Sequence, residues 1–400
     1  MRSDQLDSYR TTFTATVRAV REEDGATWVA LSDSLFYPTS GGQPHDVGSL
    51  RHGDGEADVR DVVADGPDAV LHRLEGAVPS VGDAVEGVID WDRRYRHMQR
   101  HSAQHLLSQA FLRVDPGFET RSVALASADA TIDLAGDPDD AAVAAAFDRA
   151  RAWAYAALEV EAFEVDEDEV ASYPLRRPPK VAGRIRLVRM GDVELSACGG
   201  THLRSTAEML PLLALDRQRI RGGLTRVTFR AGIEAGERAA RTVALADELA
   251  RSFSARWEEL PERVQALREE VRAARAAEGA ARAAWARLTV ASANEVHGAV
   301  PVVRLVTDDA AALAALAEAA AELRPAHVAL LAVRSEERAT LLVQAGPEAG
   351  VVDVRPALQA ALAEVDGRGG GAPDRAQGAG PRADRLEAAL DAARAVLTGG

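Results

Sequence analysis

The chain has 400 residues, 47% of them hydrophobic, and a formal net charge of −15 at pH 7. This hydrophobic content is enough to build packed cores, so it excludes a wholly disordered chain, and the length predicts about two to four domains. The negative net charge argues against a protein that coats nucleic acid without specificity, although local basic patches remain compatible with it.

Two further features concern the location of the protein. No apolar run reaches the ~18 residues that a membrane span requires, and the polar segment Met1–Arg10 contains no apolar signal sequence. Cys198 is the single cysteine, so the chain cannot form an internal disulfide. We therefore expect a cytoplasmic protein without a membrane segment.

The first part of the chain is rich in short β-prone stretches that are bounded by Gly, Asp or Pro. Strands at such spacing are typical of a small barrel. The predicted strands cover residues 9–20, 27–31, 57–63, 69–74 and 84–89. We assign residues 1–91 to an N-terminal β-barrel domain.

The pattern changes to α+β over residues 92–232. A helix is predicted over 93–112, and a second over 139–158, where Asp139 and Asp140 suit the N-terminus of a helix. Further strands are predicted at 120–126, 131–134, 161–165, 184–190 and 225–229.

Residues 233–290 are predicted to form a helical linker. Apolar or small residues recur at heptad spacing from Leu260 to Leu288, and Pro261 fits the first turn of that helix. This seam either packs on its own domain or provides the contact of a helical hairpin or a homodimer.

Residues 291–400 are predicted to form a separate C-terminal α/β domain, with the glycine-rich run 367–371 as a loop. Its strands are predicted at 300–306, 327–333 and 340–344, and its helices at 310–323, 355–364 and 384–397.

Two short patterns carry possible metal ligands. His101 and His105 lie four positions apart in a predicted helix, so their imidazoles share one face. Cys198 precedes His202 by four positions, and the two glycines between them permit a tight turn. Three imidazoles and one thiolate favour Zn²⁺. Four protein ligands are typical of structural zinc, whereas catalytic zinc usually keeps one position open, so spacing alone leaves both roles open.

These two segments, His101-Ser-Ala-Gln-His105 and Cys198-Gly-Gly-Thr-His202, resemble the editing domain of alanyl-tRNA synthetase and, even more, its AlaX relatives. Three other segments are similar to the same family. They are the glycine-rich Phe36–Pro44, the Asp90–Arg94 run before the histidine helix, and Gly367–Gly378, which resembles the C-terminal domain shared with DHH-type phosphoesterases. The resemblance spans nearly the whole chain and looks most like the long AlaX form.

The resemblance implies an α+β architecture of N-terminal barrel, zinc-binding editing domain, helical linker and C-terminal α/β domain. Because Tyr9 already begins the barrel, no aminoacylation domain is expected before it. The resemblance also implies that the chain hydrolyses the ester between tRNA(Ala) and a wrong amino acid, mainly serine and also glycine. A site built for alanine rejects an isostere with an added hydroxyl by only about 10²-fold, so a second site that binds this hydroxyl is needed.

Carried over residue by residue, the resemblance implies that His101, His105, Cys198 and His202 bind zinc. The zinc would orient the amino group of the substrate or a water molecule, and it would polarise the ester. This trans-editing deacylase would act on mischarged tRNA(Ala).

The glycine-rich segment would supply the other site residues. Thr39 is the candidate for sensing the serine hydroxyl, with the stabilisation of a turn as its alternative role. Gln43 would hold the ester or a water, with a structural role as its alternative. Gly41 and Gly42 would let the backbone approach the terminal adenosine.

Basic residues beside the predicted helix are candidates for contacts with the tRNA. We expect Arg93 and Arg94 to bind the substrate, because the arginine fork suits phosphate groups. In the C-terminal domain, RNA phosphates would meet Arg368, Gly369, Gly370 and Gly371, although a plain surface loop is the alternative there. A homodimer through the helical linker or the C-terminal domain is a further expectation.

One departure from the family pattern concerns Ala124. Relatives often have a histidine at this point of a Ser-x-His-Leu segment, and its absence here puts any catalytic help from that position in doubt. The alternative function is a non-catalytic tRNA-binding or dimerisation protein that is stabilised by zinc.

Overall fold

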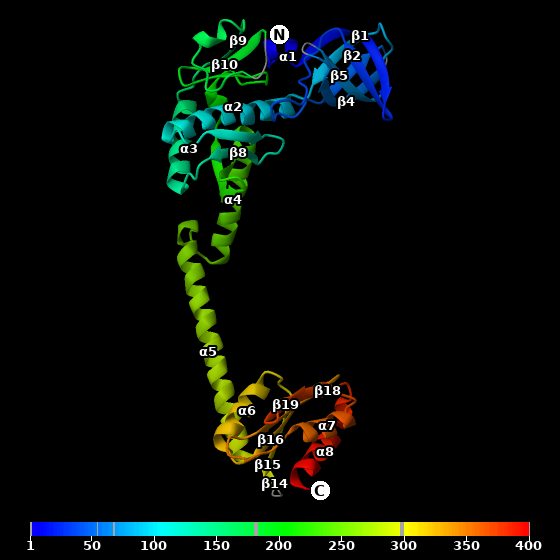
Figure 1. Ribbon diagram of the computed structural model, residues 1–400, viewed down its shortest axis with the longest axis vertical. Helices are drawn as coiled ribbons and strands as arrows, with labels where there is room; N and C mark the ends of the chain where they lie inside the picture. Colours follow the sequence, from blue (N-terminus) through cyan, green and yellow to red (C-terminus); the bar gives the residue numbers. More distant parts are fainter. Residues whose placement is uncertain (1, 54, 67–68, 180–182, 297–299, 400) are drawn as a thin grey trace. The chain divides into compact units, whose positions relative to one another are not determined.

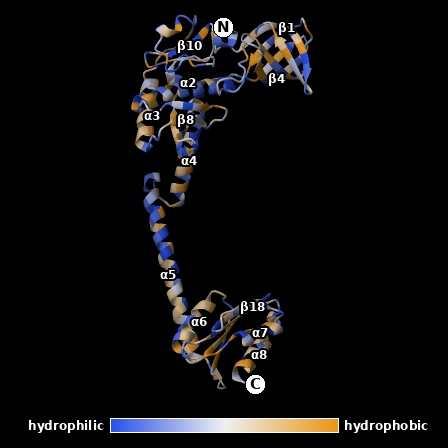
Figure 2. Ribbon diagram, viewed as in Figure 1, coloured by the Kyte–Doolittle hydropathy of each residue, from blue (hydrophilic) through white to orange (hydrophobic). Residues whose placement is uncertain are grey.

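The N-terminal segment closes into a six-stranded barrel with the strand order β1-β2-β5-β4-β3-β6 (Figure 1). Along β1 (Thr12–Glu23), Phe13, Ala15 and Val17 are buried while their neighbours are exposed, as the period of a strand requires. Figure 2 shows hydrophobic and hydrophilic residues alternating along these strands. The other strands are β2 (Ala26–Leu31), β3 (Gly48–His52), β4 (Gly55–Ala64), β5 (Val70–Gly76) and β6 (Ala84–Ile89).

The predicted barrel is therefore confirmed, although β1 begins at Thr12 and β3 was missed. Leu50 is the single buried residue of β3, so this strand shows no apolar alternation that sequence reasoning could detect.

This computed structural model describes residues 2–53, 55–66, 69–179, 183–296 and 300–399. It divides into two compact units, Met1–Glu248 and Leu249–Gly400. The barrel shares the first unit with the central α+β region. The finer domain boundaries at residues 91, 232 and 290 stay a prediction.

The central region contains two antiparallel sheets, with the orders β12-β13-β8-β7 and β11-β10-β9. Its strands and second helix are β7 (Thr120–Ala124), β8 (Ala130–Ala135), α3 (Asp140–Tyr155), β9 (Val160–Val165), β10 (Ile185–Met190), β11 (Glu194–Ala197), β12 (Leu212–Ile220) and β13 (Leu224–Ala231). Sequence reasoning missed β11, which has four residues, and β12, in which only Leu212 is buried.

Helix α2 (Trp91–Val114) reaches from the barrel into the central core (Figure 1). Asp90 caps its N-terminus by accepting a hydrogen bond from the Arg93 backbone N–H at 3.1 Å. Met98 and Phe111 are fully buried, and the polar residues between them, except Gln109, are buried as well. Because α2 is enclosed, its polar side chains need partners inside the protein.

The predicted helical linker consists of two helices, α4 (Gly232–Ser252) and α5 (Leu260–Ser292). A short 3₁₀ turn, Trp257–Glu259, precedes α5, and Pro261 lies in the first turn of α5 as predicted.

Most of α5 is exposed to solvent. Ala286 and Val290, outside the heptad seam, pack against α6 (Ala312–Leu323). The seam residues Leu267 and Val271 are 46% and 43% exposed. The seam therefore does not pack against its own domain.

The second unit also holds a six-stranded sheet in the order β14-β15-β16-β17-β19-β18. Apolar side chains from α5 and α6 cover one face, and those from α7 (Arg355–Glu364) and α8 (Leu386–Thr398) cover the other. The strands are β14 (Glu295–Val296), β15 (Val302–Thr307), β16 (Val328–Arg334), β17 (Ala339–Ala345), β18 (Arg368–Gly371) and β19 (Arg375–Gly380).

The glycine-rich run is the edge strand β18, so its prediction as a loop is wrong. A Cβ atom on Gly369 would lie 2.3 Å from the Gln377 carbonyl oxygen, and one on Gly371 would lie 2.3 Å from that of Arg375. The glycines are needed because β18 and β19 approach so closely.

The described residues contain no helix that is long and apolar enough to cross a membrane.

Candidate metal centre

Four side chains from two distant segments meet at one point in the first unit. The ligand atoms of His101, His105, Cys198 and His202 all lie within 4.8 Å of one another. His101 and His105 extend from one face of α2, with ring centroids 5.1 Å apart. The Cys198 sulfur lies 3.4 Å from Nε2 of His101 and 3.3 Å from Nε2 of His202. The structure thus brings together the four residues that the two patterns singled out.

The loop after β11 carries the second pair of ligands, Cys198 and His202. A Cβ atom on Gly200 would lie 2.0 Å from Cε1 of His101, so only glycine leaves room for that imidazole. The buried Arg186 donates to the carbonyl oxygens of Cys198 and Gly200 at 2.8 and 2.9 Å. Arg186 therefore fixes the backbone of the loop that carries these two ligands.

Each of the three imidazoles has a partner on its Nδ1 atom. The Gln43 amide oxygen lies 2.7 Å from Nδ1 of His101, and the Ser102 hydroxyl lies 3.1 Å from that of His202. For His105, Glu194 and Ser196 place oxygens 3.2 and 2.9 Å from Nδ1. In all three residues Nε2 is left for the centre, which is the arrangement that metal-binding histidines generally show.

The electrostatics of the cluster suit a thiolate. Burial raises the pKa of the Cys198 thiol, but the charges of His101, His202 and His105 lower it more, and the pKa lies well below its ordinary value. Thiolate is the form of cysteine that binds metals. Burial by itself raises the pKa of Glu194, but His105 and Arg176 together have a larger, opposite effect. The pKa of Glu194 is therefore lowered, and this carboxylate stays ionised beside His105.

The donor set fits a zinc ion. Three imidazole nitrogens and one thiolate sulfur, each held by the surrounding residues, form the tetrahedral type of set that zinc prefers. The clash that a side chain on Gly200 would cause shows that the loop is built around the position of His101.

Gln43 contacts the ligand His101, which fits the structural role that was its alternative, and its contact with ester or water stays a prediction. Its side chain is fully buried, and its amide oxygen also accepts from the Thr201 backbone N–H at 3.2 Å. Its amide nitrogen donates to the Thr201 hydroxyl at 2.8 Å. Because an amide oxygen can only accept, the proton of His101 lies on Nδ1.

We expect Gln43→Ala to weaken zinc binding by roughly 10- to 100-fold, the usual effect of losing a group that orients a metal ligand. Zinc affinity in competition with a chromogenic chelator measures this effect. Gln104→Ala is the matched control, because Gln104 is a buried glutamine of α2 whose amide donates to Ser108 rather than to a ligand. Equal zinc affinities for the two variants would contradict this role of Gln43.

The rest of the glycine-rich segment forms a tight turn. Ser40 and Gln43 exchange backbone hydrogen bonds of 3.1 and 2.9 Å, and Gly41 and Gly42 between them have φ values of +57° and +86°. A Cβ atom on Gly42 would lie 3.3 Å from Val123, so this glycine makes room for β7, whereas Gly41 is open to solvent. The expected approach of adenosine to these glycines stays a prediction.

Thr39 is exposed, and its hydroxyl is already engaged. It accepts a hydrogen bond from the His45 backbone N–H at 3.1 Å and lies 3.1 Å from Nδ1 of the same residue. These contacts fit the stabilisation of the turn, which was the alternative role for Thr39. Its role in sensing a serine hydroxyl stays a prediction.

The two arginines at the start of α2 differ from each other. Arg94 is fully buried, forms an ion pair with the equally buried Asp46, and donates to the carbonyl oxygens of Ser8 and Leu35. Its expected contact with substrate is therefore wrong, because no solvent reaches its guanidinium. Arg93 is half-buried and donates to the His45 carbonyl oxygen at 3.1 Å, and its substrate role stays a prediction.

Sequence reasoning missed the residues that hold the ligands. Glu194, Ser196 and Arg186 lie on short strands whose pairing the sequence does not reveal, and none belongs to a motif. Ser102 directly follows a ligand, but a serine inside a helix is too common to be a signal. The predicted RNA contacts at Arg368, Gly369, Gly370 and Gly371 lie on β18 in the second unit, where all four residues are exposed.

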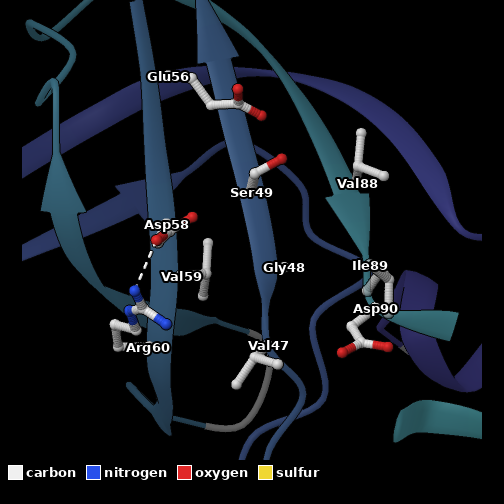
Figure 3. A pocket seen from close by; sticks show the side chains of 10 residues that line it. All are labelled: Val47, Gly48, Ser49, Glu56, Asp58, Val59, Arg60, Val88, Ile89 and Asp90. Atoms are coloured by element: carbon white, nitrogen blue, oxygen red, sulfur yellow. Dashed lines mark hydrogen bonds and ion pairs between the residues drawn. The ribbon is translucent and has the colours of Figure 1, made fainter. Parts of the chain in front are cut away.

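A hollow of about 430 Å³ lies on the outside of the barrel, on β3, β4 and β6 (Figure 3). Inside it, Arg60 forms an ion pair with Asp58 at 2.7 Å, and Asp90 is the cap of α2. These charges are already used in the fold, and none of the four cluster residues lines the hollow. It is therefore a weaker candidate than the four-residue cluster.

Three family descriptions match the sequence. They are "tRNA synthetases class II (A)" over residues 9–93, "Threonyl and Alanyl tRNA synthetase second additional domain" over 185–228, and "DHHA1 domain" over 299–399.

Curated relatives match most of the chain. Alanine–tRNA ligase of Archaeoglobus fulgidus is 32% identical over 88% of this chain and 39% of its own length. The corresponding protein of Halorubrum lacusprofundi is 32% identical over 98% of this chain and 43% of its own length. The chain thus spans about two fifths of these relatives. Among solved structures, the C-Ala domain from Aquifex aeolicus alanyl-tRNA synthetase is 22% identical over 26% of this chain and 99% of that chain, with a TM-score of 0.25.

Proposed function

Because this chain consists of domains related to alanyl-tRNA synthetase and matches alanine–tRNA ligases over most of its length, we propose that it is an editing deacylase. It hydrolyses the ester that joins serine, and also glycine, to tRNA(Ala). The observation that carries this proposal is the cluster of His101, His105, Cys198 and His202. Two of these residues, Cys198 and His202, lie in the segment 185–228 that matches the second additional domain of threonyl and alanyl tRNA synthetases.

The residues at this centre have two different roles, which are to bind the metal and to orient its ligands. His101, His105, Cys198 and His202 would hold a zinc ion, which, when bound, supplies a Lewis acid that polarises the ester carbonyl or lowers the pKa of a water. Gln43, Ser102 and the Glu194–Ser196 pair keep the three imidazoles in one orientation. The site is therefore rigid before the substrate arrives, which lowers the cost of reaching the transition state.

The proposed selectivity follows from the chemistry of the two amino acids. Serine differs from alanine by one hydroxyl, which an alanine-sized pocket rejects only weakly, whereas a site that hydrogen-bonds this hydroxyl strongly disfavours a substrate without it. Thr39 is our candidate for that contact, through the one hydrogen-bonding position of its hydroxyl that remains beyond its two bonds to His45.

The test is a deacylation assay with the zinc-loaded full chain. Seryl, glycyl and alanyl esters of tRNA(Ala) are compared, and we expect the seryl ester to be cleaved at least about 10²-fold faster than the alanyl ester. Removal of zinc by a chelator should abolish hydrolysis while the far-UV circular dichroism spectrum is kept. A zinc-loaded chain that hydrolyses none of the three esters would refute the proposal.

A second candidate function is a zinc-stabilised tRNA-binding or dimerisation protein without catalysis. The observation in its favour is the exposed apolar seam of α5, where Leu267 and Val271 are 46% and 43% exposed, since such a seam is typical of helices that pair with a second copy. Light scattering and the same assay separate the two candidates. A dimer that binds tRNA, loses its fold on chelation and cleaves no ester would favour this second function.

A further inference from the structure

A small cavity beside the metal centre has no role in the function described so far. Its volume is about 120 Å³, and the metal-ligand residue His202 forms part of its wall together with Arg186. The N-terminal segment 5–9 and residues 160–162 of β9 form the other walls. A group bound in this cavity therefore lies next to a metal ligand.

A stacked pair of side chains stands at this cavity. The Arg204 guanidinium lies over the ring of Tyr9, with its central carbon 4.1 Å from the ring centroid, and both residues line the cavity. The side chain of Arg204 is 65% exposed, so the guanidinium face that points away from Tyr9 is available. Leu6, also in the wall, is 66% exposed and adds apolar surface at the opening.

The pair is held in a fixed orientation. Asp7 forms an ion pair with Arg204 at 3.1 Å, and the Tyr9 hydroxyl accepts a hydrogen bond from the Arg204 backbone N–H at 3.0 Å. The Tyr9 and Tyr95 hydroxyls both donate to one oxygen of Glu208, at 2.6 and 2.9 Å. A ligand that stacks here meets a surface that is already ordered, which reduces the entropic cost of binding.

The inner wall of the cavity carries a positive charge. Arg186 uses its terminal nitrogens to hold carbonyl oxygens of the ligand loop and of Gln5. Its Nε atom is buried and has no hydrogen-bond partner among the described residues. Because protein atoms enclose this nitrogen, a ligand in the cavity does not reach it, and Arg186 acts on a ligand through its positive charge.

Exposed planar cations and aromatic rings next to positive charge are the features that bind single-stranded nucleic acid, because any base can stack on them. We propose that the terminal nucleotide of the 3′ single-stranded end of an RNA binds here, with its base on Arg204 and its sugar in the cavity. The cavity suits a sugar-sized group and is too small for a whole nucleotide. This inference rests on the proposed function, since it places the esterified sugar beside His202.

The experiment measures how the terminal base contributes to RNA binding. Two uncharged RNA hairpins with a single-stranded 3′ end are compared by fluorescence anisotropy, one complete and one with an abasic terminal nucleotide. The zinc-loaded full chain should bind the complete RNA about 5- to 150-fold more tightly, the range that stacking of one base provides. Arg204→Ala should remove this difference between the two RNAs.

Two further variants isolate the cause. Arg204→Lys keeps the charge but loses the planar group, so it should behave like Arg204→Ala in this comparison. Arg226→Ala is the control, because Arg226 is also an exposed arginine in an ion pair, with Asp133, outside the cavity. It should keep the full difference between the two RNAs. Arg189 is unsuitable as a control, since its partner Glu161 lines the cavity.

The outcomes separate this inference from the proposed function. If the wild type does not distinguish the two RNAs, or if both Arg204 variants still do so while retaining zinc, the inference is overturned even when ester hydrolysis is observed. If the base-dependent difference requires Arg204 but no ester is hydrolysed, the nucleotide site stands and the proposed function fails. The binding assay uses uncharged RNA, so it does not depend on catalysis.

Discussion

His101→Ala is expected to reduce bound zinc from about one ion per chain to none under dilute conditions, and to lower the hydrolysis of seryl-tRNA(Ala) by more than about 100-fold. Loss of a residue that only orients a ligand already weakens metal binding by roughly 10- to 100-fold, and loss of the ligand itself removes a bond to the metal. The variant also leaves the Gln43 amide oxygen without its imidazole partner. Zinc content by atomic absorption and the rate of serine release are the two measurements.

His97→Ala is the matched control for this variant. His97 is also a buried histidine of α2, one turn before His101, and it is not part of the cluster. Burial and the nearby Arg100 and Arg93 lower its pKa to about 3, so it is neutral at the pH of the assay. The control should keep its zinc and its activity even if it is somewhat less stable. Full hydrolysis by His101→Ala would show that the cluster has no part in the reaction.

Asp46→Ala should cause the second large effect, a loss of about 3–5 kcal/mol in the free energy of unfolding. Both side chains of the Asp46–Arg94 pair are 0% exposed, and a charge that stays buried after its partner is removed destabilises a protein by this amount. The Asp46 carboxylate also accepts from the Tyr37 backbone N–H at 2.6 Å. Removing it therefore loosens the segment that carries Gln43 as well.

Urea unfolding followed by circular dichroism measures this change. The control is Asp58→Ala, which also breaks an aspartate–arginine pair of the barrel, but one whose side chains are 52% and 50% exposed. Such a surface pair contributes at most about 1 kcal/mol. Similar losses in the two variants would mean that burial of the Asp46–Arg94 pair has no special importance.

The metal ligands could be predicted from the sequence because their pairs are local. The helical period places His101 and His105 on one face, and the two glycines let Cys198 and His202 point to one centre. The groups that orient them could not be predicted in this way. Gln43 lies 58 positions from its histidine, and Glu194 lies 89 positions from His105, so only the folded chain shows these contacts.

The wrong expectations share one physical cause, which is that residue type does not report the surroundings of a residue in the fold. Arg94 looks like a phosphate-binding arginine in the sequence, but the barrel and α2 enclose it with a carboxylate. The glycines of β18 look like those of a loop, but they are required where two strands approach closely. Strands such as β3 and β12, with one buried residue each, lack the apolar alternation on which sequence prediction depends.

The ties between the barrel and α2 have a consequence for the modularity of the chain. A cut near residue 91 would separate Arg94 from Asp46 and would take Gln43 away from His101, although it would pass between two regions that look independent in the sequence. The barrel is therefore not an accessory that can be exchanged or deleted. It lies in the same compact unit as the metal centre, and a transplanted centre would need both parts to keep its ligands in place.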